Sequence, residues 1–422
     1  MDLHRTIGDI WTRLAIACAI AATLLAGVPV DGWGAEPAGA HWIGTWATAP
    51  VAQPPAAPTS IGFNNQTLRQ VVRISAGGRR IRVRFANTFG AKPVKVGAAH
   101  VALREKGAAI KPGSDRMLTF GGAMAATMWP GGYLVSDPVD LDVPPLADVA
   151  VSLYLSGDVP VTLPITFHGT AKQTNYISPA GDHTTDMDMP VASTKQSWYF
   201  VSAVEVLAPR GTGVIVALGD SLTDANVSTA DTNSRWPNAL AKRLIAAGAP
   251  MGVMNVGTGG GRLLHDGNGD SGLRRFDRDV LSQPGVTHLI VLLGINDIRR
   301  RPTNPDPAEI VSADDMISGY KQLIVRAHAR GIKIYGCTIL PFENETFVPG
   351  AYTPEGEAVR QAVNAWMRSS KAFDALIDLD KVMRDPAHSA RLLPQYDSED
   401  HLHPNDAGYL HMGEVMDLAL FK

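Results

Sequence analysis

Cysteine is nearly absent from this sequence, so disulfide bonds are excluded as a source of stability. The chain has two cysteines, Cys18 and Cys337. We expect the N-terminal segment that carries Cys18 to be removed, which leaves one cysteine and no intramolecular disulfide. Cys337 lies in the apolar run 332–340. In such a run a cysteine behaves as a small buried hydrophobic residue rather than as a catalytic group.

An excess of charge of either sign is also missing. Lys and Arg together number 38, Asp and Glu number 41, and the formal net charge is −3. This balance gives no basic surface for nucleic acid or for an anionic membrane, so we expect neither as a partner. With 45% hydrophobic residues over 422 positions, the chain is typical of a globular protein long enough for two domains.

Long apolar runs are absent apart from one near the N-terminus. Arg5 and Arg13 precede an uncharged run at 14–30, and small residues such as Gly34 and Ala35 follow it. This order predicts a secretory signal peptide at residues 1–35. The run is Ala-rich and shorter than the roughly 20 apolar residues that span a bilayer, so we expect cleavage rather than a stable membrane anchor. A cleaved protein is secreted or periplasmic.

Residues 41–207 form a region of short β-branched runs separated by Gly and Pro, at 71–75, 80–85, 94–102, 149–155, 165–168 and 199–206. This pattern predicts a β-sandwich or jelly-roll-like domain. At 80–85 basic residues alternate with apolar ones, as expected of a strand with one solvated face.

Residues 211–422 have a different pattern, in which apolar strands alternate with amphipathic helices. We expect strands at 214–218, 252–256, 287–293, 332–339 and 375–379. We expect helices near 235–247, 273–281, 313–329 and 355–370. Such a βαβ succession predicts a doubly wound α/β domain with a parallel sheet, whose active groups lie at the carboxyl ends of the strands. The domain junction is expected near 208–211.

Ser221 occupies the position in this pattern where a serine can act as a nucleophile. It lies in Gly219-Asp220-Ser221-Leu222, directly after the first apolar strand and before a loop, which places it on a tight turn. The Gly-x-Ser-x-Gly elbow of α/β-hydrolases is absent. A Gly-Asp-Ser tripeptide alone is a weak signal.

The whole set of motifs resembles the SGNH (GDSL) hydrolases, in which the site is spread over four blocks. All four occur in order, at 219–224, 255–260, 294–297 and 400–404. The upstream β-rich segment is similar to the leader of secreted bacterial GDSL lipase and acetylxylan-esterase-like proteins. The resemblance implies a flavodoxin-like three-layer α/β fold and a serine esterase.

The matched positions imply a role for each site residue. Ser221 is the expected nucleophile, His403 the base that takes its proton, and Asp400 the group that orients the imidazole. The resemblance places the oxyanion donors at the backbone N–H of Ser221 and of Gly260 and at the side chain of Asn296, with Gly257 as the alternative glycine. No metal or organic cofactor is implied.

Neighbouring residues leave alternatives open. His401 and His403 form a His-x-His pair that could bind metal, although the spacing favours the catalytic role for His403. Arg262 is equally suited to a salt bridge or to substrate contact, whereas Trp236 suits packing against the sheet. Ala225 stands where the family often has glycine.

The resulting hypothesis is a secreted carboxylic ester hydrolase that forms an acyl-enzyme and deacetylates acylated carbohydrate. Its substrate would be a small-molecule or polysaccharide ester. A lipase or lysophospholipase, or an acyltransferase, is the alternative enzyme. A carbohydrate-binding surface protein with a residual hydrolase fold is the non-enzymatic alternative. The sequence leaves the oligomeric state open.

Overall fold

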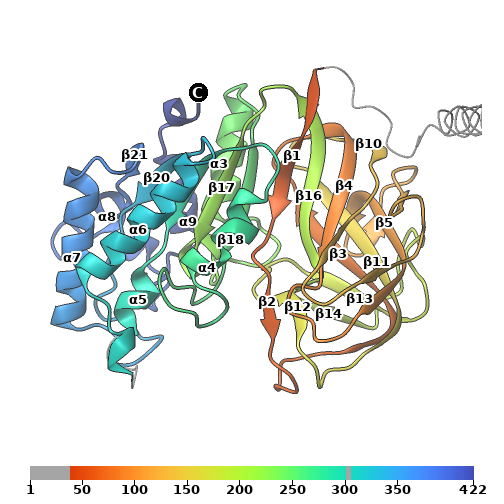
Figure 1. Ribbon diagram of the computed structural model, residues 1–422, viewed down its shortest axis with the longest axis horizontal. Coiled ribbons are helices and arrows are strands. Elements are labelled where there is room, and N and C mark those ends of the chain that lie inside the picture. The colour runs from red at the N-terminus through yellow and green to blue at the C-terminus, as the bar shows by residue number, and fades with distance from the viewer. Residues whose placement is uncertain (1–38, 301–305) are drawn as a thin grey trace, which may run out of the picture. The chain divides into compact units, whose positions relative to one another are not determined.

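The computed structural model describes residues 39–300 and 306–422. The predicted signal peptide at 1–35 and Cys18 lie outside the described residues. Residues 38–422 form one compact unit, which contains a β-rich part (39–209) followed by an α/β part (214–422) (Figure 1). No helix within the described ranges has the length and hydropathy needed to cross a membrane.

The β-rich part consists of antiparallel sheets. One has the order β1 (Ala40–Ala47), β16 (Val201–Pro209), β4 (Gly78–Ala86), β10 (Val139–Val143), with β9 (Tyr133–Val135) paired to β4. The second has the order β14 (Ser193–Lys195), β13 (Asn175–Ala180), β3 (Phe63–Arg73), β11 (Asp148–Val159), β5 (Val94–Lys106), β6 (Ala109–Ile110), with β7 (Arg116–Leu118) and β8 (Ala126–Met128) paired to β5. A small third sheet has the order β15 (Trp198–Tyr199), β12 (Ile165–His168), β2 (Val51–Gln53). The expected β-rich region is therefore present.

Alternation along the strands builds the core of this part. In β4 the side chains of Ile81, Val83 and Phe85 are fully buried, as a strand with one inward face requires. The expectation that the intervening basic residues are solvated is wrong for Arg84. That side chain is 7% exposed, and its guanidinium donates to the side chain of Gln283 in the α/β part.

The α/β part contains one parallel sheet of five strands. They are β17 (Val214–Gly219), β18 (Gly252–Gly257), β19 (Val286–Leu292), β20 (Lys333–Cys337) and β21 (Ala375–Ile377). In space their order is β18-β17-β19-β20-β21, and all neighbouring pairs are parallel. Numbered along the chain this is 2-1-3-4-5, the flavodoxin-like order, in which ligands bind beyond the carboxyl ends of the strands where the order reverses.

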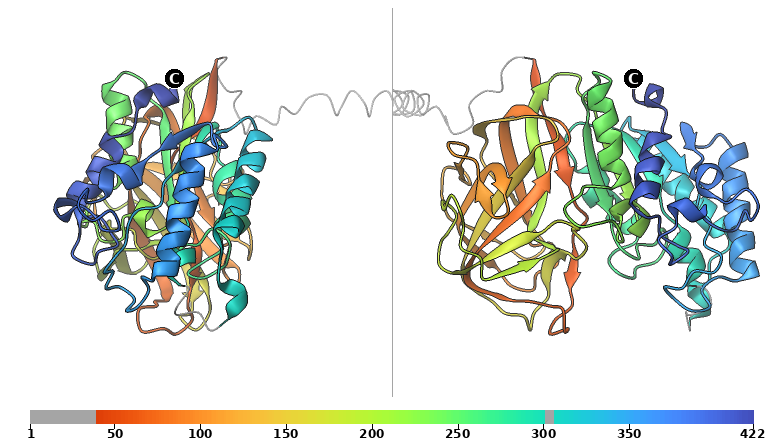
Figure 2. Two further views of the ribbon diagram at one scale, coloured as in Figure 1. Left: turned by 90° about the vertical axis from the view of Figure 1, so that its left-hand side faces the viewer. Right: turned by 180° about the vertical axis from the view of Figure 1, so that it is seen from behind.

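Helices cover both faces of this sheet. The helices of the α/β part are α2 (Ser221–Asp224), α3 (Trp236–Ala246), α4 (Gly272–Phe276), α5 (Ile295–Arg299), α6 (Ala313–His328), α7 (Pro354–Ser369), α8 (Leu379–Met383) and α9 (Asp406–Glu414). Helical segments of other types are the π-helix η1 (Asp277–Leu281) and the 3₁₀ turns η3 (Pro307–Glu309), η4 (Pro394–Tyr396) and η5 (Leu418–Phe421). Seen along the sheet, α3 and α9 lie on one face and α4 and α6 on the other (Figure 2).

The two parts meet where β1 packs against β18, an edge strand of the parallel sheet. Gly44 of β1 donates its N–H to the carbonyl of Pro284 at 3.0 Å. A Cβ atom on Gly252 of β18 would collide with the carbonyl oxygen of Gly44. The backbones of β1 and β18 therefore approach more closely than a side chain on Gly252 would allow. In this way β1 covers the edge of the parallel sheet that β18 forms.

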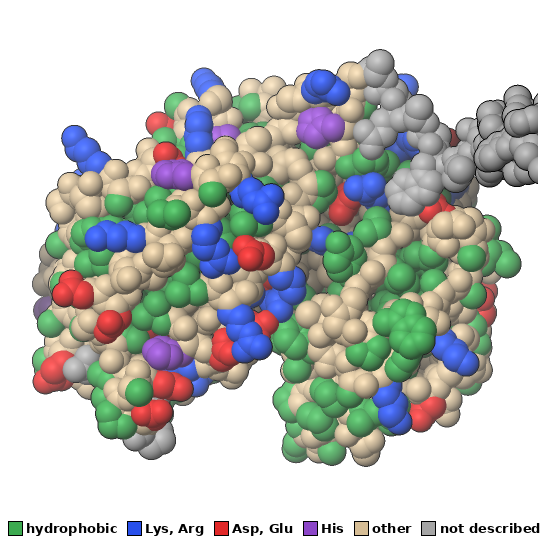
Figure 3. Space-filling view, in the orientation of Figure 1, with side chains coloured by type: hydrophobic (Ala, Val, Ile, Leu, Met, Phe, Trp, Pro, Cys, Tyr) green, Lys and Arg blue, Asp and Glu red, His purple; other side chains and the backbone are tan. Residues whose placement is uncertain are grey.

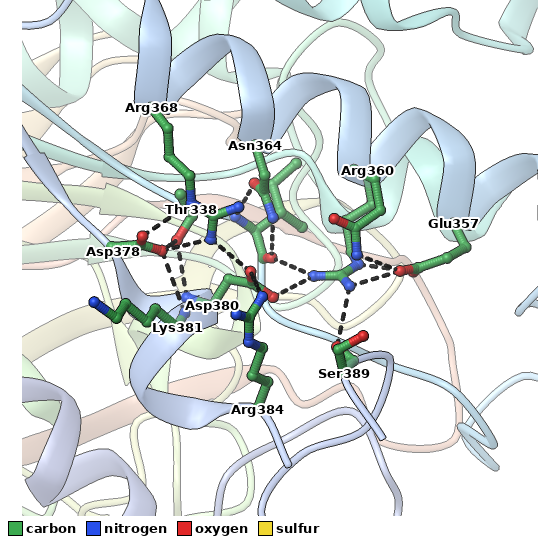
Figure 4. Close-up of polar contacts among 12 residues, drawn as sticks. Thr338, Glu357, Arg360, Asn364, Arg368, Asp378, Asp380, Lys381, Arg384 and Ser389 are labelled. Carbon is green, nitrogen blue, oxygen red and sulfur yellow. Dashed lines mark hydrogen bonds and ion pairs between the residues drawn. The ribbon is translucent and has the colours of Figure 1, made fainter. Parts of the chain in front are cut away.

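A buried ion network joins α7 to α8 (Figure 4). Asp380 has no exposed surface and accepts hydrogen bonds from Arg360 at 2.6 Å, from Arg368 at 2.6 Å and from Arg384 at 3.3 Å. Arg360 is also held by Glu357. Because removing one member would leave buried charges unpaired, this network fixes the two helices in one arrangement.

Candidate active site

Ser221 lies at the carboxyl end of β17, which pairs with β18 on one side and β19 on the other. The strand ends at Gly219 and α2 begins at Ser221, with no loop between them except Asp220. The Asp220 side chain caps the helix by accepting the N–H of Leu222 at 2.9 Å. Ala225, the residue that follows the helix, has φ of 58°. A left-handed conformation favours glycine, so an alanine is strained at this position.

His403 and Asp400 approach Ser221 from the loop before α9. The Nε2 atom of His403 lies 2.8 Å from the Oγ of Ser221. On the other side of the ring, Nδ1 lies 2.6 Å from Oδ2 of Asp400. The three groups form a continuous hydrogen-bonded chain, and the His403 side chain is almost completely buried.

Asp400 is held as a carboxylate by its surroundings. Its Oδ1 accepts the backbone N–H groups of Leu402 at 2.9 Å and of His403 at 2.7 Å. Partial burial acts to raise the pKa of Asp400, but the hydrogen bonds and charge of His403 outweigh it and lower the pKa well below the ordinary value. Asp400 is therefore ionised at neutral pH, with its negative charge opposite Nδ1 of His403.

Two backbone N–H groups near Ser221 are available to a ligand. Within 39–300 and 306–422, no residue accepts a hydrogen bond from the N–H of Ser221 or of Gly260. The N–H of Gly257, the alternative glycine, instead donates to the side chain of Asn255 at 2.9 Å. Gly260 has φ of 70°, and a Cβ there would lie 2.7 Å from the Asn268 amide. Of the two glycines, Gly260 therefore keeps a free N–H among the described residues, whereas the N–H of Gly257 is engaged.

Asn296 follows β19, and its side chain is oriented from both ends. Its Nδ2 donates to the carbonyl of Gly261 at 3.0 Å, and its Oδ1 accepts from Arg299 at 3.4 Å. Arg299 is itself fixed by a two-pronged ion pair with Glu345, at 2.8 and 2.9 Å. Because Nδ2 has two hydrogens, one remains for a ligand.

These groups line a cleft of about 820 Å³. From the α/β part the lining includes Ser221, Gly260, Asn296, Arg299, Phe347 and His403. From the β-rich part it includes Val51, Pro54, Phe89, Phe167 and Thr170. Figure 3 shows the hollow in this face between the part that carries α5 and the part that carries β2. The β-rich part therefore forms one wall of the cleft.

The other residues considered from the sequence have structural partners. Nδ1 of His401 lies 2.5 Å from Oδ2 of Asp397. The hydrogen-bond partners of His403 are different residues, Asp400 and Ser221. Arg262 forms a salt bridge with Glu309 at 2.8 Å, which is one of the two alternatives considered for it. Trp236 is fully buried, as expected for packing. Cys337 is buried in β20, and burial raises the pKa of its thiol.

Two carboxyl groups beside the site are fully buried. Burial raises the pKa of Asp220 to about 7. Burial likewise raises the pKa of Asp297 to about 6, although the N–H groups of Leu263 and Leu264 donate to it. Asp220 consequently keeps its proton at pH values where an exposed carboxyl is ionised.

The sequence analysis did not identify several residues of the site region. Arg299 could have been identified, because it lies three residues after Asn296 and so on the same face of a helix. Glu345 and Phe347 lie in a loop without a motif. The ring of Phe347 is 65% exposed and its centre lies 5.7 Å from that of His403. It is an open apolar surface at the edge of the cleft.

Residues 217–410 match the model of the GDSL-like lipase/acylhydrolase family. The chain carries a GDSL-like lipase/acylhydrolase domain. It is accordingly an enzyme, a serine esterase. The matched residues include Ser221, Asn296 and His403, all of which line the cleft.

Among solved structures, this chain is similar to a putative lipolytic protein of the G-D-S-L family from Desulfitobacterium hafniense, with 21% identity, a TM-score of 0.36, and coverage of 48% of this chain and 97% of that one. A GDSL-like lipase from Bacteroides thetaiotaomicron is 18% identical, with a TM-score of 0.38 and coverage of 49% and 87%. An acetyl xylan esterase is 19% identical, with a TM-score of 0.37 and coverage of 48% and 96%. No curated protein matches the chain.

Proposed function

We propose that this GDSL-like enzyme hydrolyses carboxylic esters through an acyl-enzyme formed on Ser221, and that it acts on acylated carbohydrate after export. The observation that carries the mechanism is the hydrogen-bonded chain from Asp400 through His403 to Ser221, with distances of 2.6 and 2.8 Å. Nucleophile, base and orienting carboxylate lie in the order that acyl transfer requires.

Each proton has a defined route in this mechanism. As the Oγ of Ser221 bonds to the ester carbon, its proton passes to Nε2 of His403. The resulting imidazolium is stabilised through Nδ1–H by Asp400, which stays ionised. When the tetrahedral intermediate collapses, Nε2 returns the proton to the leaving alcohol. Water then repeats the sequence on the acyl-enzyme and releases the acid.

The developing oxyanion is stabilised by three donors, the N–H groups of Ser221 and Gly260 and the free hydrogen of Asn296 Nδ2. Loss of one such donor typically costs about 10²–10³ in kcat. The contacts of the amide support this role, since Arg299 engages Oδ1 and the carbonyl of Gly261 takes only one of the two hydrogens on Nδ2.

Acylated carbohydrate is supported by the breadth of the cleft, about 820 Å³ and open between two parts of the chain. A bulky alcohol is easier to seat in such a cleft than in a narrow tunnel. The exposed ring of Phe347 offers a flat surface beside His403, where the alcohol leaves. The predicted signal peptide supports export.

A lipase-type or lysophospholipase-type activity is the second candidate, favoured by the apolar wall of Val51, Pro54, Phe89 and Phe167. A panel of p-nitrophenyl esters from acetyl to palmitoyl, together with acetylated xylan, separates the two. Highest kcat/KM on acetyl esters with acetate release from xylan supports the carbohydrate proposal. A preference for acyl chains of eight or more carbons, with no release from xylan, supports the lipase.

A further inference from the structure

The helix that begins at Ser221 is held at its other end by the β-rich part. Asp224, the last residue of α2, has a carboxylate that is 3% exposed and lies against β12. Its Oδ1 is 3.0 Å from Nε2 of His168, and its Oδ2 accepts the hydroxyl of Thr170. A helix of four residues has little stability of its own. The position of Ser221 therefore depends on what fixes Asp224.

His168 is itself held on every side. Its Nδ1 lies 2.9 Å from the carbonyl of Ala49, which can only accept, so Nδ1 carries a proton. The bond to Asp224 requires a second proton between Nε2 and the carboxylate. The imidazole also packs against Trp198, with ring centres 5.6 Å apart. Because side chains alternate along a strand, the preceding Phe167 faces the cleft while His168 faces α2.

Arg235 closes the arrangement from the α/β side. Its Nε donates to the carbonyl of Asp224 at 2.8 Å, and its Nη2 donates to the carbonyl of Thr170 at 3.1 Å. The guanidinium lies over the ring of Trp198, 5.6 Å from its centre. One residue of α2 is thus tied to the β-rich part both directly and through a shared arginine.

We propose that His168 is a positioning residue for the ester hydrolysis. With Thr170 it fixes Asp224, and through α2 it holds the Oγ of Ser221 within hydrogen-bonding reach of His403. The proposal rests on the proposed function, because it assigns the nucleophile to Ser221. A misplacement of about 1 Å at a reacting atom costs about 10²-fold in rate, so a small shift of α2 has a measurable effect.

Two substitutions distinguish the bond to Asp224 from the rest of the His168 environment. In His168→Gln the side-chain amide reaches the position of Nε2 and keeps a donor to Asp224. In His168→Asn the amide reaches only the position of Nδ1 and keeps the donor to Ala49. We expect His168→Asn to lower kcat at least 10-fold with KM changed less than twofold, and His168→Gln to keep kcat within threefold of the wild type.

The matched control is Gln283→Ala, which removes a different contact between the same two parts, the one to Arg84. This variant should lose thermal stability at unchanged kcat. A double-mutant cycle with Asp224→Asn completes the test, because after His168→Asn the second substitution should add little further loss.

Labelling of Ser221 by a fluorophosphonate in the wild-type protein tests the nucleophile of the proposed function independently of His168. With that label established, wild-type kcat in a folded His168→Asn variant overturns the positioning role. Equal losses in His168→Asn and His168→Gln, or additive losses in the cycle, overturn it as well. Absence of the label on Ser221 instead overturns the proposed function.

Discussion

Asp400→Asn tests the orientation of the catalytic imidazole. Both oxygens of Asp400 accept hydrogen bonds, Oδ1 from two backbone N–H groups and Oδ2 from Nδ1 of His403. An asparagine has one acceptor oxygen, so it cannot satisfy both sides. If the amide oxygen keeps the hydrogen bonds from the two backbone N–H groups, the amide nitrogen faces Nδ1. That nitrogen is a donor, so it cannot accept a hydrogen bond from Nδ1–H. The imidazole then carries its proton on Nε2 and cannot take one from Ser221.

The expected loss in kcat is about 10⁴, as for a wrong histidine tautomer in serine hydrolases, and it should be smaller than that of Ser221→Ala. The assay is turnover of a short-chain p-nitrophenyl ester, normalised to the folded fraction. KM should change little, because Asp400 is two groups removed from the substrate.

Asp397 offers a matched control in the same loop. It also binds a histidine, His401 at 2.5 Å, and accepts two backbone N–H groups on its other oxygen. Asp397→Asn therefore repeats the change outside the site and should leave kcat within threefold. A kcat for Asp400→Asn within tenfold of the wild type, or equal losses in the two variants, would refute the tautomer argument.

Three further outcomes are expected. Asn296→Ala should lower kcat by about 10²–10³ at nearly unchanged KM, whereas a lower melting temperature with normal kcat would remove Asn296 from the site. Asp380→Ala should destabilise the fold by about 3–5 kcal/mol in thermal or urea unfolding, since three arginines lose their shared carboxylate; a loss under 1 kcal/mol contradicts that network. Asp220 has a pKa raised by burial to about 7, so the folded state binds more protons than the unfolded one between about pH 4 and 7, and stability falls as pH rises through that window. Asp220→Asn should therefore gain melting temperature relative to the wild type as pH rises from 4.5 to 7.5, and a constant difference would contradict the shift.

The sequence predicts the α/β part well because its signals are local. The helix expected at 313–329 appears as α6 (Ala313–His328), and Ser312 and Asp315 form a capping box that marks its start. The helix expected at 273–281 is present but changes at Asp277 from α to π turns. Propensity gives no indication of that change.

The β-rich part is predicted less completely because its strands depend on distant partners. β1 (Ala40–Ala47) contains two tryptophans and a glycine without clear alternation, and it is a strand because it pairs with β16 and packs on β18. The alternation of basic and apolar residues predicts that Arg84 is exposed. In the structure it is buried at the junction between the two parts, where it donates a hydrogen bond to Gln283. Such contacts join residues far apart in the chain, so no local rule indicates them.

The same distinction applies to the site. Ser221, Gly260 and Asn296 each follow a strand, and the ends of parallel strands meet at one edge of the sheet, so the motifs alone indicate that these residues lie together. His168 lies 56 residues before Asp224 in a strand without a motif. Only the folded arrangement of the two parts brings it to α2.

Covalent trapping shows directly whether Ser221 carries the acyl group. Wild-type protein is treated with a fluorophosphonate, digested and mapped by mass spectrometry, in parallel with Ser221→Ala. We expect a single adduct on the peptide that contains Ser221, formed together with loss of esterase activity and absent from the variant. An adduct on another residue, or a Ser221→Ala protein that is labelled and hydrolyses esters at the wild-type rate, would contradict it.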